Sequence, residues 1–145
     1  MTGKKPKPNY YLSLLTMKCP RCRRGSMFNN KNPYSKLKLS HIFDMPEHCA
    51  VCGQKYDMEP GFWYGTGYVS YALAVAMSLA SFVAWVILIG ISVDDNRIFW
   101  WLGVNIALLV LTQPWLMRLS RAVYIRFFVR YDENYEQTKP TQLYD

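Results

Sequence analysis

Charge is absent from two long stretches of this sequence. No Asp, Glu, Lys, Arg or His occurs from Pro60 to Val93, and none occurs from Ile98 to Met117. Ion and proton pathways through membranes usually use such groups, so their absence argues against transport by this chain alone. About 20 apolar residues cross the ~30 Å hydrocarbon layer of a bilayer. The pattern therefore predicts two transmembrane helices. The alternative, a pair of core helices in a soluble protein, is disfavoured because the remaining residues are few and polar.

Recognisable catalytic signatures are also missing. The sequence contains no HExxH motif, no Gly-rich phosphate loop and no evident nucleophile–base arrangement. Glu59 with Tyr64 is a candidate polar pair beside the membrane, but a carboxylate there also suits the positive end of a helix dipole. We therefore expect a protein that is not an enzyme and has no small-molecule substrate.

Basic residues are unevenly distributed. Residues 1–60 contain 11 Lys/Arg against 4 Asp/Glu, whereas the loop between the apolar stretches contains Arg97 beside two aspartates. Positive flanks of membrane segments stay in the cytoplasm, so both termini are predicted to be cytoplasmic. Anionic lipid is an expected partner, and nucleic acid is not, because membrane topology and lipid attraction already account for the charge. The candidate headgroup ligands, for which contact with the N-terminal module is the alternative, are Arg118, Arg121, Arg126 and Arg130.

The four cysteines form two CxxC pairs, Cys19 with Cys22 and Cys49 with Cys52. Two such pairs suit one tetrahedral tetrathiolate site, and a cytoplasmic location disfavours structural disulfides. The predicted metal is zinc, bound structurally, with iron as the rival and a redox dithiol less favoured because it needs only one pair. Gly25 and Gly53 fit the turns that follow, because glycine tolerates positive φ.

Small residues recur along both apolar stretches. In lipid, a small-xxx-small pattern lets two helix backbones approach closely, either within the hairpin or against a partner helix. Asn105 lies at depth in the second stretch and can hydrogen-bond across helices. The candidate packing or partner residues are Gly65, Ala72, Ala76, Ala80, Ala84, Gly103, Asn105 and Ala107.

The predicted fold is a mainly α membrane protein with four parts. A basic arm (1–16) precedes a small zinc-ribbon-like module (17–58), whose few apolar residues require coupled metal binding and folding. The transmembrane hairpin occupies 59–117, with helices at about 62–93 and 98–117, and a basic helical extension with a flexible tail occupies 118–145. Whether this extension continues the second helix or lies on the membrane stays open.

The segments "CPRCRRGSMF" and "CAVCGQKYDMEPGFWYGTGYVSYAL", followed by the hairpin, resemble the bacterial family called domain of unknown function nine-eight-three, over about residues 15 to 131. The resemblance implies metal ligation by the four cysteines and a family signature at Glu59, Pro60, Gly61 and Tyr64 whose role is unknown. It implies a fold and an inner-membrane location rather than an activity. Members of the family accompany terminal-oxidase assembly genes.

The favoured function is a non-enzymatic accessory subunit or assembly factor of a bacterial inner-membrane complex, either a respiratory terminal oxidase or a secretion machine. Its expected partners are other integral membrane proteins. Two alternatives remain: a membrane-tethered zinc-ribbon nucleic-acid binder, and a redox or metal-handling membrane protein.

Overall fold

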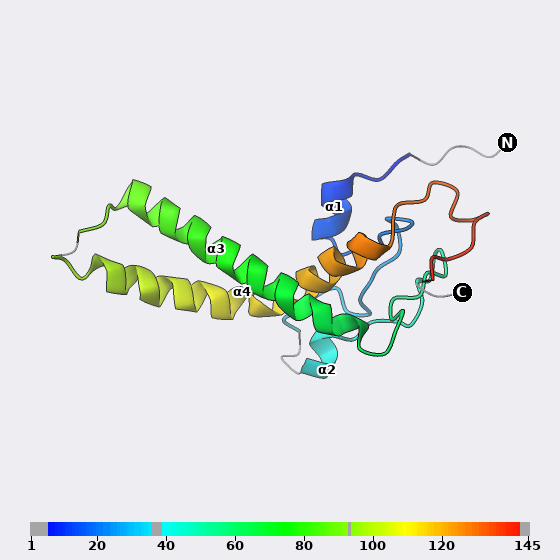
Figure 1. The fold of residues 1–145 in the computed structure, drawn as a ribbon, viewed down its shortest axis with the longest axis horizontal. Helices are drawn as coiled ribbons and strands as arrows, with labels where there is room; N and C mark the ends of the chain where they lie inside the picture. Colours follow the sequence, from blue (N-terminus) through cyan, green and yellow to red (C-terminus); the bar gives the residue numbers. More distant parts are fainter. Residues whose placement is uncertain (1–5, 36–38, 93, 143–145) are drawn as a thin grey trace.

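The computed structural model describes residues 6–35, 39–92 and 94–142. The chain is mainly helical, and a long antiparallel helical hairpin projects from a smaller head that contains α1, α2, the end of α4 and the described segment that follows it (Figure 1). The elements in order are α1 (Tyr10–Leu15), α2 (Leu39–Ile42), the 3-10 helix η1 (Phe62–Gly65), α3 (Thr66–Leu88) and α4 (Arg97–Phe128).

Two helices are long and apolar enough to span a membrane. The first comprises η1 and α3, Phe62–Leu88, and the second is α4. In the most apolar 18-residue window of each, 0% and 6% of the residues are buried inside the protein. Core helices of a soluble protein would be largely buried, so these exposures favour lipid as the surroundings of the hairpin.

A polar cluster joins the two hairpin helices. The Asn105 side chain donates to Ser78 Oγ (3.3 Å), and Ser81 Oγ donates to Asn105 Oδ1 (3.0 Å). Trp101 Nε1 donates to the same Ser81 hydroxyl (3.3 Å). These bonds confirm the prediction that Asn105 hydrogen-bonds across the two helices. Asn105 is 7% exposed.

The small residues of the hairpin face outward. Four alanines of α3 and two small residues of α4 are exposed, and a Cβ at Gly103 would meet no described atom within 4 Å. The prediction that the two hairpin helices pack on each other through these small residues is therefore wrong. The helices contact each other through larger and polar side chains instead. The residues concerned are Ala72, Ala76, Ala80, Ala84, Gly103 and Ala107.

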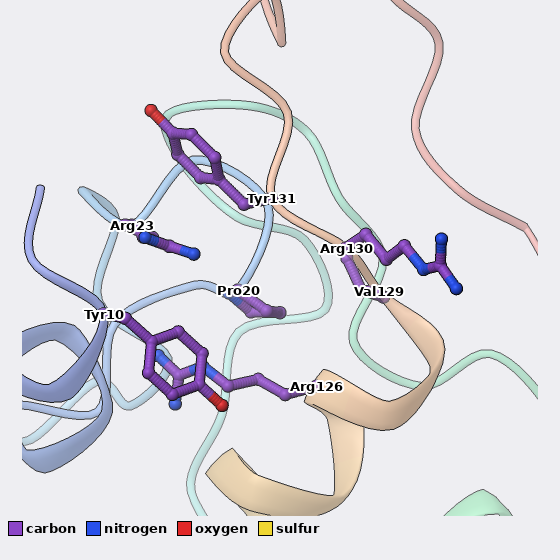
Figure 2. Close-up of a pocket in the computed structure, with 7 residues that line it drawn as sticks. All are labelled: Tyr10, Pro20, Arg23, Arg126, Val129, Arg130 and Tyr131. Atoms are coloured by element: carbon purple, nitrogen blue, oxygen red, sulfur yellow. The ribbon is translucent and has the colours of Figure 1, made fainter. Parts of the chain in front are cut away.

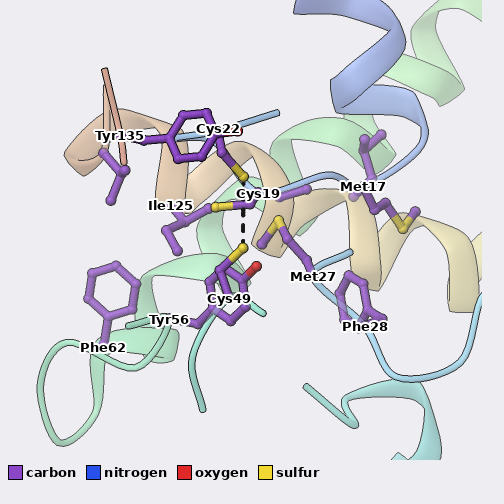
Figure 3. Close-up of a cluster of buried hydrophobic side chains, with 13 residues drawn as sticks. Met17, Cys19, Cys22, Met27, Phe28, Cys49, Tyr56, Phe62, Ile125 and Tyr135 are labelled. Atoms are coloured by element: carbon purple, nitrogen blue, oxygen red, sulfur yellow. Dashed lines mark hydrogen bonds between the residues drawn. The ribbon is translucent and has the colours of Figure 1, made fainter. Parts of the chain in front are cut away.

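The basic extension continues the second hairpin helix, since α4 runs unbroken to Phe128 and includes Pro114. Its last turns enter the head, where Leu119, Ala122 and Ile125 are at most 8% exposed. These residues belong to one apolar cluster with three of the metal-site cysteines and the side chains around them (Figure 3). Hairpin and head therefore share a helix and a core.

The Glu-Pro-Gly segment makes the turn into the hairpin. The Phe62 amide donates to the Glu59 carbonyl (3.0 Å), and Gly61 has φ +83°. Phe62 is buried against the rings of Tyr124 and Phe128, with centroids 5.1 and 5.2 Å away. The signature residues Glu59, Pro60 and Gly61 thus shape the hairpin entry, Tyr64 is 87% exposed beside it, and Gly65 packs against Tyr124.

Candidate metal centre

Four cysteine sulfurs converge in the head. The Sγ atoms of Cys19, Cys22, Cys49 and Cys52 lie within 4.8 Å of one another, and none of the four is in a disulfide. The Cys19–Cys52 and Cys22–Cys49 sulfur pairs are 3.6 and 3.8 Å apart. Sulfurs at tetrahedral corners, with metal–sulfur bonds of ~2.3 Å, stand about 3.8 Å from each other. The spacing fits, so the group could hold a metal ion, as predicted.

Each CxxC pair lies on a turn of the same construction. In the first, the Cys19 amide donates to the Gly25 carbonyl and the Arg23 amide donates to the Cys19 carbonyl, both at 2.8 Å. In the second, the Cys49 amide donates to Gln54 and the Gly53 amide to Cys49, both at 2.9 Å. An isolated β-bridge closes each turn, Lys18 with Ser26 and His48 with Lys55. The two turns face each other and present two sulfurs each.

Glycine has different uses in the two turns. Gly53, directly after Cys52, has φ +69°, and the prediction of a left-handed residue there is confirmed. The equivalent residue of the first turn is Arg23, with φ +54°. Gly25 is outside the left-handed region, contrary to the prediction, and is needed for another reason: a Cβ there would overlap Cys49 Sγ.

The crowded thiols perturb one another. Hydrogen bonds with the other three cysteines, together with burial, raise the pKa of Cys19 well above the ordinary thiol value. The hydrogen bond with Cys19 lowers the pKa of Cys22 to about 6. Burial raises the pKa of the neighbouring Tyr56, whose side chain is 1% exposed and donates to the Ser26 carbonyl (3.3 Å). A divalent cation bound here would supply the positive charge that allows all four sulfurs to be thiolates together.

The C-terminal segment covers the centre. Arg21, inside the first CxxC pair, is 1% exposed and donates to the carbonyls of Cys52 (3.1 Å) and Thr138 (2.6 Å). Its guanidinium also lies 3.6 Å from the Asp132 carboxylate, whose pKa is lowered mainly by the Thr138 hydroxyl. Gln54 exchanges two hydrogen bonds with the Thr141 backbone, at 2.7 and 2.9 Å. The tail from Glu133 onward, expected to be flexible, is therefore held against the metal module at Thr138, Lys139 and Thr141.

Three of the four candidate headgroup arginines contact the N-terminal module. Arg118 is 1% exposed and donates to the carbonyls of Ile42 (3.0 Å) and Asn30 (2.6 Å). Arg121 stacks over the Phe43 ring at 4.0 Å. Arg126 reaches Ser13 Oγ (3.2 Å) and the Lys18 carbonyl (3.3 Å), while Arg130 is exposed.

Sequence reasoning missed Arg21, Gln54, Tyr56 and the covering tail. Arg21 and Gln54 are polar residues next to metal ligands, and a polar residue at such a position is normally solvated. Their partners lie far away in the sequence: Arg21 contacts Cys52, 31 residues away, and both residues contact the tail, 87 or more residues away. The Tyr56 position within the quoted cysteine segment was the one available signal.

Comparison of the chain with protein-family models, curated proteins and solved structures finds no match. The resemblance to the nine-eight-three family therefore stays an expectation.

Proposed function

We propose that this protein is a non-enzymatic accessory subunit or assembly factor of a bacterial inner-membrane complex. Both termini lie in the cytoplasm, and the four cysteines bind zinc. A respiratory terminal oxidase and a secretion machine are the two candidate complexes. Zinc is favoured over iron because four protein thiolates complete a closed tetrahedral shell that needs no redox change, which is the donor set of structural zinc sites.

The outward-facing alanines of α3 carry the proposal. Ala72, Ala76, Ala80 and Ala84 are exposed, while Ser78 and Ser81 of the same helix bind Asn105 of α4. The hairpin thus associates through one face of α3 and leaves a small-residue face toward lipid. Such a face allows close backbone approach by another transmembrane helix, and packing is the main force for association in lipid.

The continuity of α4 supports a bracing role for the head. The N-terminal part of α4 is the second helix of the hairpin, and its C-terminal part belongs to the core of the head. The metal module is therefore held at a fixed position relative to the hairpin. A partner helix seated on α3 would therefore meet the head at a defined place on the cytoplasmic side. This geometry suits a protein that aligns the membrane and cytoplasmic parts of a larger complex.

The test is purification of the tagged full chain in mild detergent from its native membrane. We expect a stoichiometric integral membrane partner with the wild type, and its loss with Ala76→Leu and Ala80→Leu, because the added side chains keep the backbones apart. Val75→Leu, at a neighbouring exposed position, is the matched control and should retain the partner. Zinc content and helicity should be equal in all variants. Recovery of a lone hairpin, or retention of the partner by both alanine variants, would contradict the proposal.

A further inference from the structure

A pocket of about 200 Å³ lies where α1, the first cysteine turn and the end of α4 meet. Its lining includes three arginines, Arg23, Arg126 and Arg130, with the tyrosines Tyr10 and Tyr131. Figure 2 shows the Arg23 side chain between the two tyrosine rings, Arg126 beneath Tyr10, and the Arg130 guanidinium turned away from the rings. None of the described residues lining this pocket is acidic.

Arg23 occupies a backbone position that favours glycine. Its φ of +54° is in the left-handed region, and the equivalent residue after the second cysteine pair is Gly53. A non-glycine residue in this region costs about 1 kcal/mol or more. Glycine would therefore adopt this backbone conformation at a lower free energy than arginine does. Backbone outliers of this kind concentrate at functional sites.

The Arg23 guanidinium is held in place with donors to spare. It stacks at 4.2 Å from the Tyr131 ring centroid and 5.2 Å from that of Tyr10. One of its nitrogens donates to the Pro8 carbonyl (3.2 Å). Stacking engages the faces of the guanidinium, and five N–H donors lie in its plane, so this hydrogen bond leaves donors for a ligand.

The charges around the pocket favour an anion. Arg126 is engaged by Ser13 and Lys18 and offsets the negative end of the α4 dipole. Asp132, which follows Tyr131, points to Arg21 and Thr138. Arg23 thus keeps N–H donors beyond its Pro8 contact, and the exposed Arg130, whose guanidinium is turned away from the rings, would rotate toward the pocket to contact an anion. Lys7 Nζ, which is outside the lining, lies 5.5 Å from the Tyr131 ring.

We propose that this pocket binds a phosphate group. Guanidinium groups bind phosphate oxygens through paired, charge-assisted hydrogen bonds, and a phosphate can engage more than one arginine. The volume is below the ~300–1,000 Å³ of sites for drug-sized ligands, which suits a small anion or one phosphate of a larger molecule. The proposal does not depend on the accessory role of the protein.

The ligand is a soluble phosphate compound rather than a lipid headgroup. From Met117, the predicted inner end of the transmembrane segment, α4 continues to Phe128, which at 1.5 Å per residue is about 16 Å. The pocket lies at this far end of the helix, beyond the headgroup layer that adjoins the hydrocarbon.

The test titrates inorganic phosphate into the zinc-loaded full chain in phosphatidylcholine nanodiscs, by isothermal calorimetry. Arg23→Gly and Arg130→Gln should each weaken binding about tenfold or more, because each removes a charge-assisted contact. Arg24→Gln is the matched control: it removes one charge next to Arg23 but outside the lining, and should change the affinity less than about twofold. Arg23→Gly should keep its zinc and its melting temperature, because glycine relieves the left-handed backbone.

Two results would overturn the site: absence of phosphate binding by the wild type, or an equal loss of affinity in Arg24→Gln and the two pocket variants. Unchanged binding by Arg130→Gln together with a destabilised Arg23→Gly would assign Arg23 to holding the N-terminal arm instead. A second arm measures phosphatidic acid retained from mixed nanodiscs by native mass spectrometry. Equal retention by wild type and Arg23→Gly supports the soluble source, whereas loss in Arg23→Gly would assign the pocket to lipid.

Discussion

Replacing Gly25 with alanine is expected to weaken zinc binding while leaving the hairpin intact. A Cβ at this position would overlap Cys49 Sγ, which is also 3.8 Å from Cys22 Sγ. In the metal-bound form the sulfur cannot move aside without distorting the tetrahedron, because metal–ligand distances tolerate only about 0.2 Å. Overpacking of this kind costs about 1–3 kcal/mol. At 1.4 kcal/mol per tenfold, this corresponds to a loss of about 5- to 140-fold in zinc affinity.

The assay is competition for zinc against a chromophoric chelator, with the full chain in detergent. Cobalt substitution adds a second readout, because the ligand-field bands of a tetrahedral thiolate site report the distortion directly. Gly53→Ala is the matched control: it places a Cβ in the left-handed region, at a cost of about 1 kcal/mol, but a Cβ there would meet no described atom within 4 Å. It should lower the melting temperature without altering the cobalt bands. Wild-type zinc affinity in Gly25→Ala would refute the reasoning.

Three further outcomes are expected. Arg21→Met removes charged hydrogen bonds to Cys52 and Thr138, each worth about 1.5–3 kcal/mol, and should raise amide exchange in residues 132–142; unchanged exchange would contradict the clamping role. Asn105→Leu should destabilise the hairpin by about 0.6–2 kcal/mol, measured by steric trapping in bicelles, with equal unfolding to wild type as the contrary result. Zinc removal by a chelator should abolish protection in residues 17–58 while far-UV helicity of α3 and α4 persists; a head that stays protected would disprove coupled folding.

Local patterns made the hairpin and the cysteine centre predictable. An uncharged run long enough to span a membrane as a helix, and a CxxC turn, are each recognised from a few neighbouring residues. Two membrane-competent helices and a four-sulfur group could therefore be predicted from the sequence. Contacts between distant segments were not predictable in this way. The tail reads as flexible because it is polar, yet Tyr135 is 8% exposed and Thr141 pairs with Gln54. Their partners lie in the cysteine turns, and no short window contains both sides of such a contact.

The faces of α3 show why spacing alone could not identify what its alanines contact. Positions four apart drift about 40° around a helix with 3.6 residues per turn, so the alanine repeat winds along one side while Ser78 and Ser81 occupy another. Ser78 and Ser81 of α3 face α4 because the Asn105 side chain is costly to leave without hydrogen bonds in lipid, and its partners must lie opposite it. Alanine offers no hydrogen bond to compete for that position. The same polar contacts that close the hairpin therefore leave the small-residue face of α3 outward, and this is the face on which the proposed partner helix would dock.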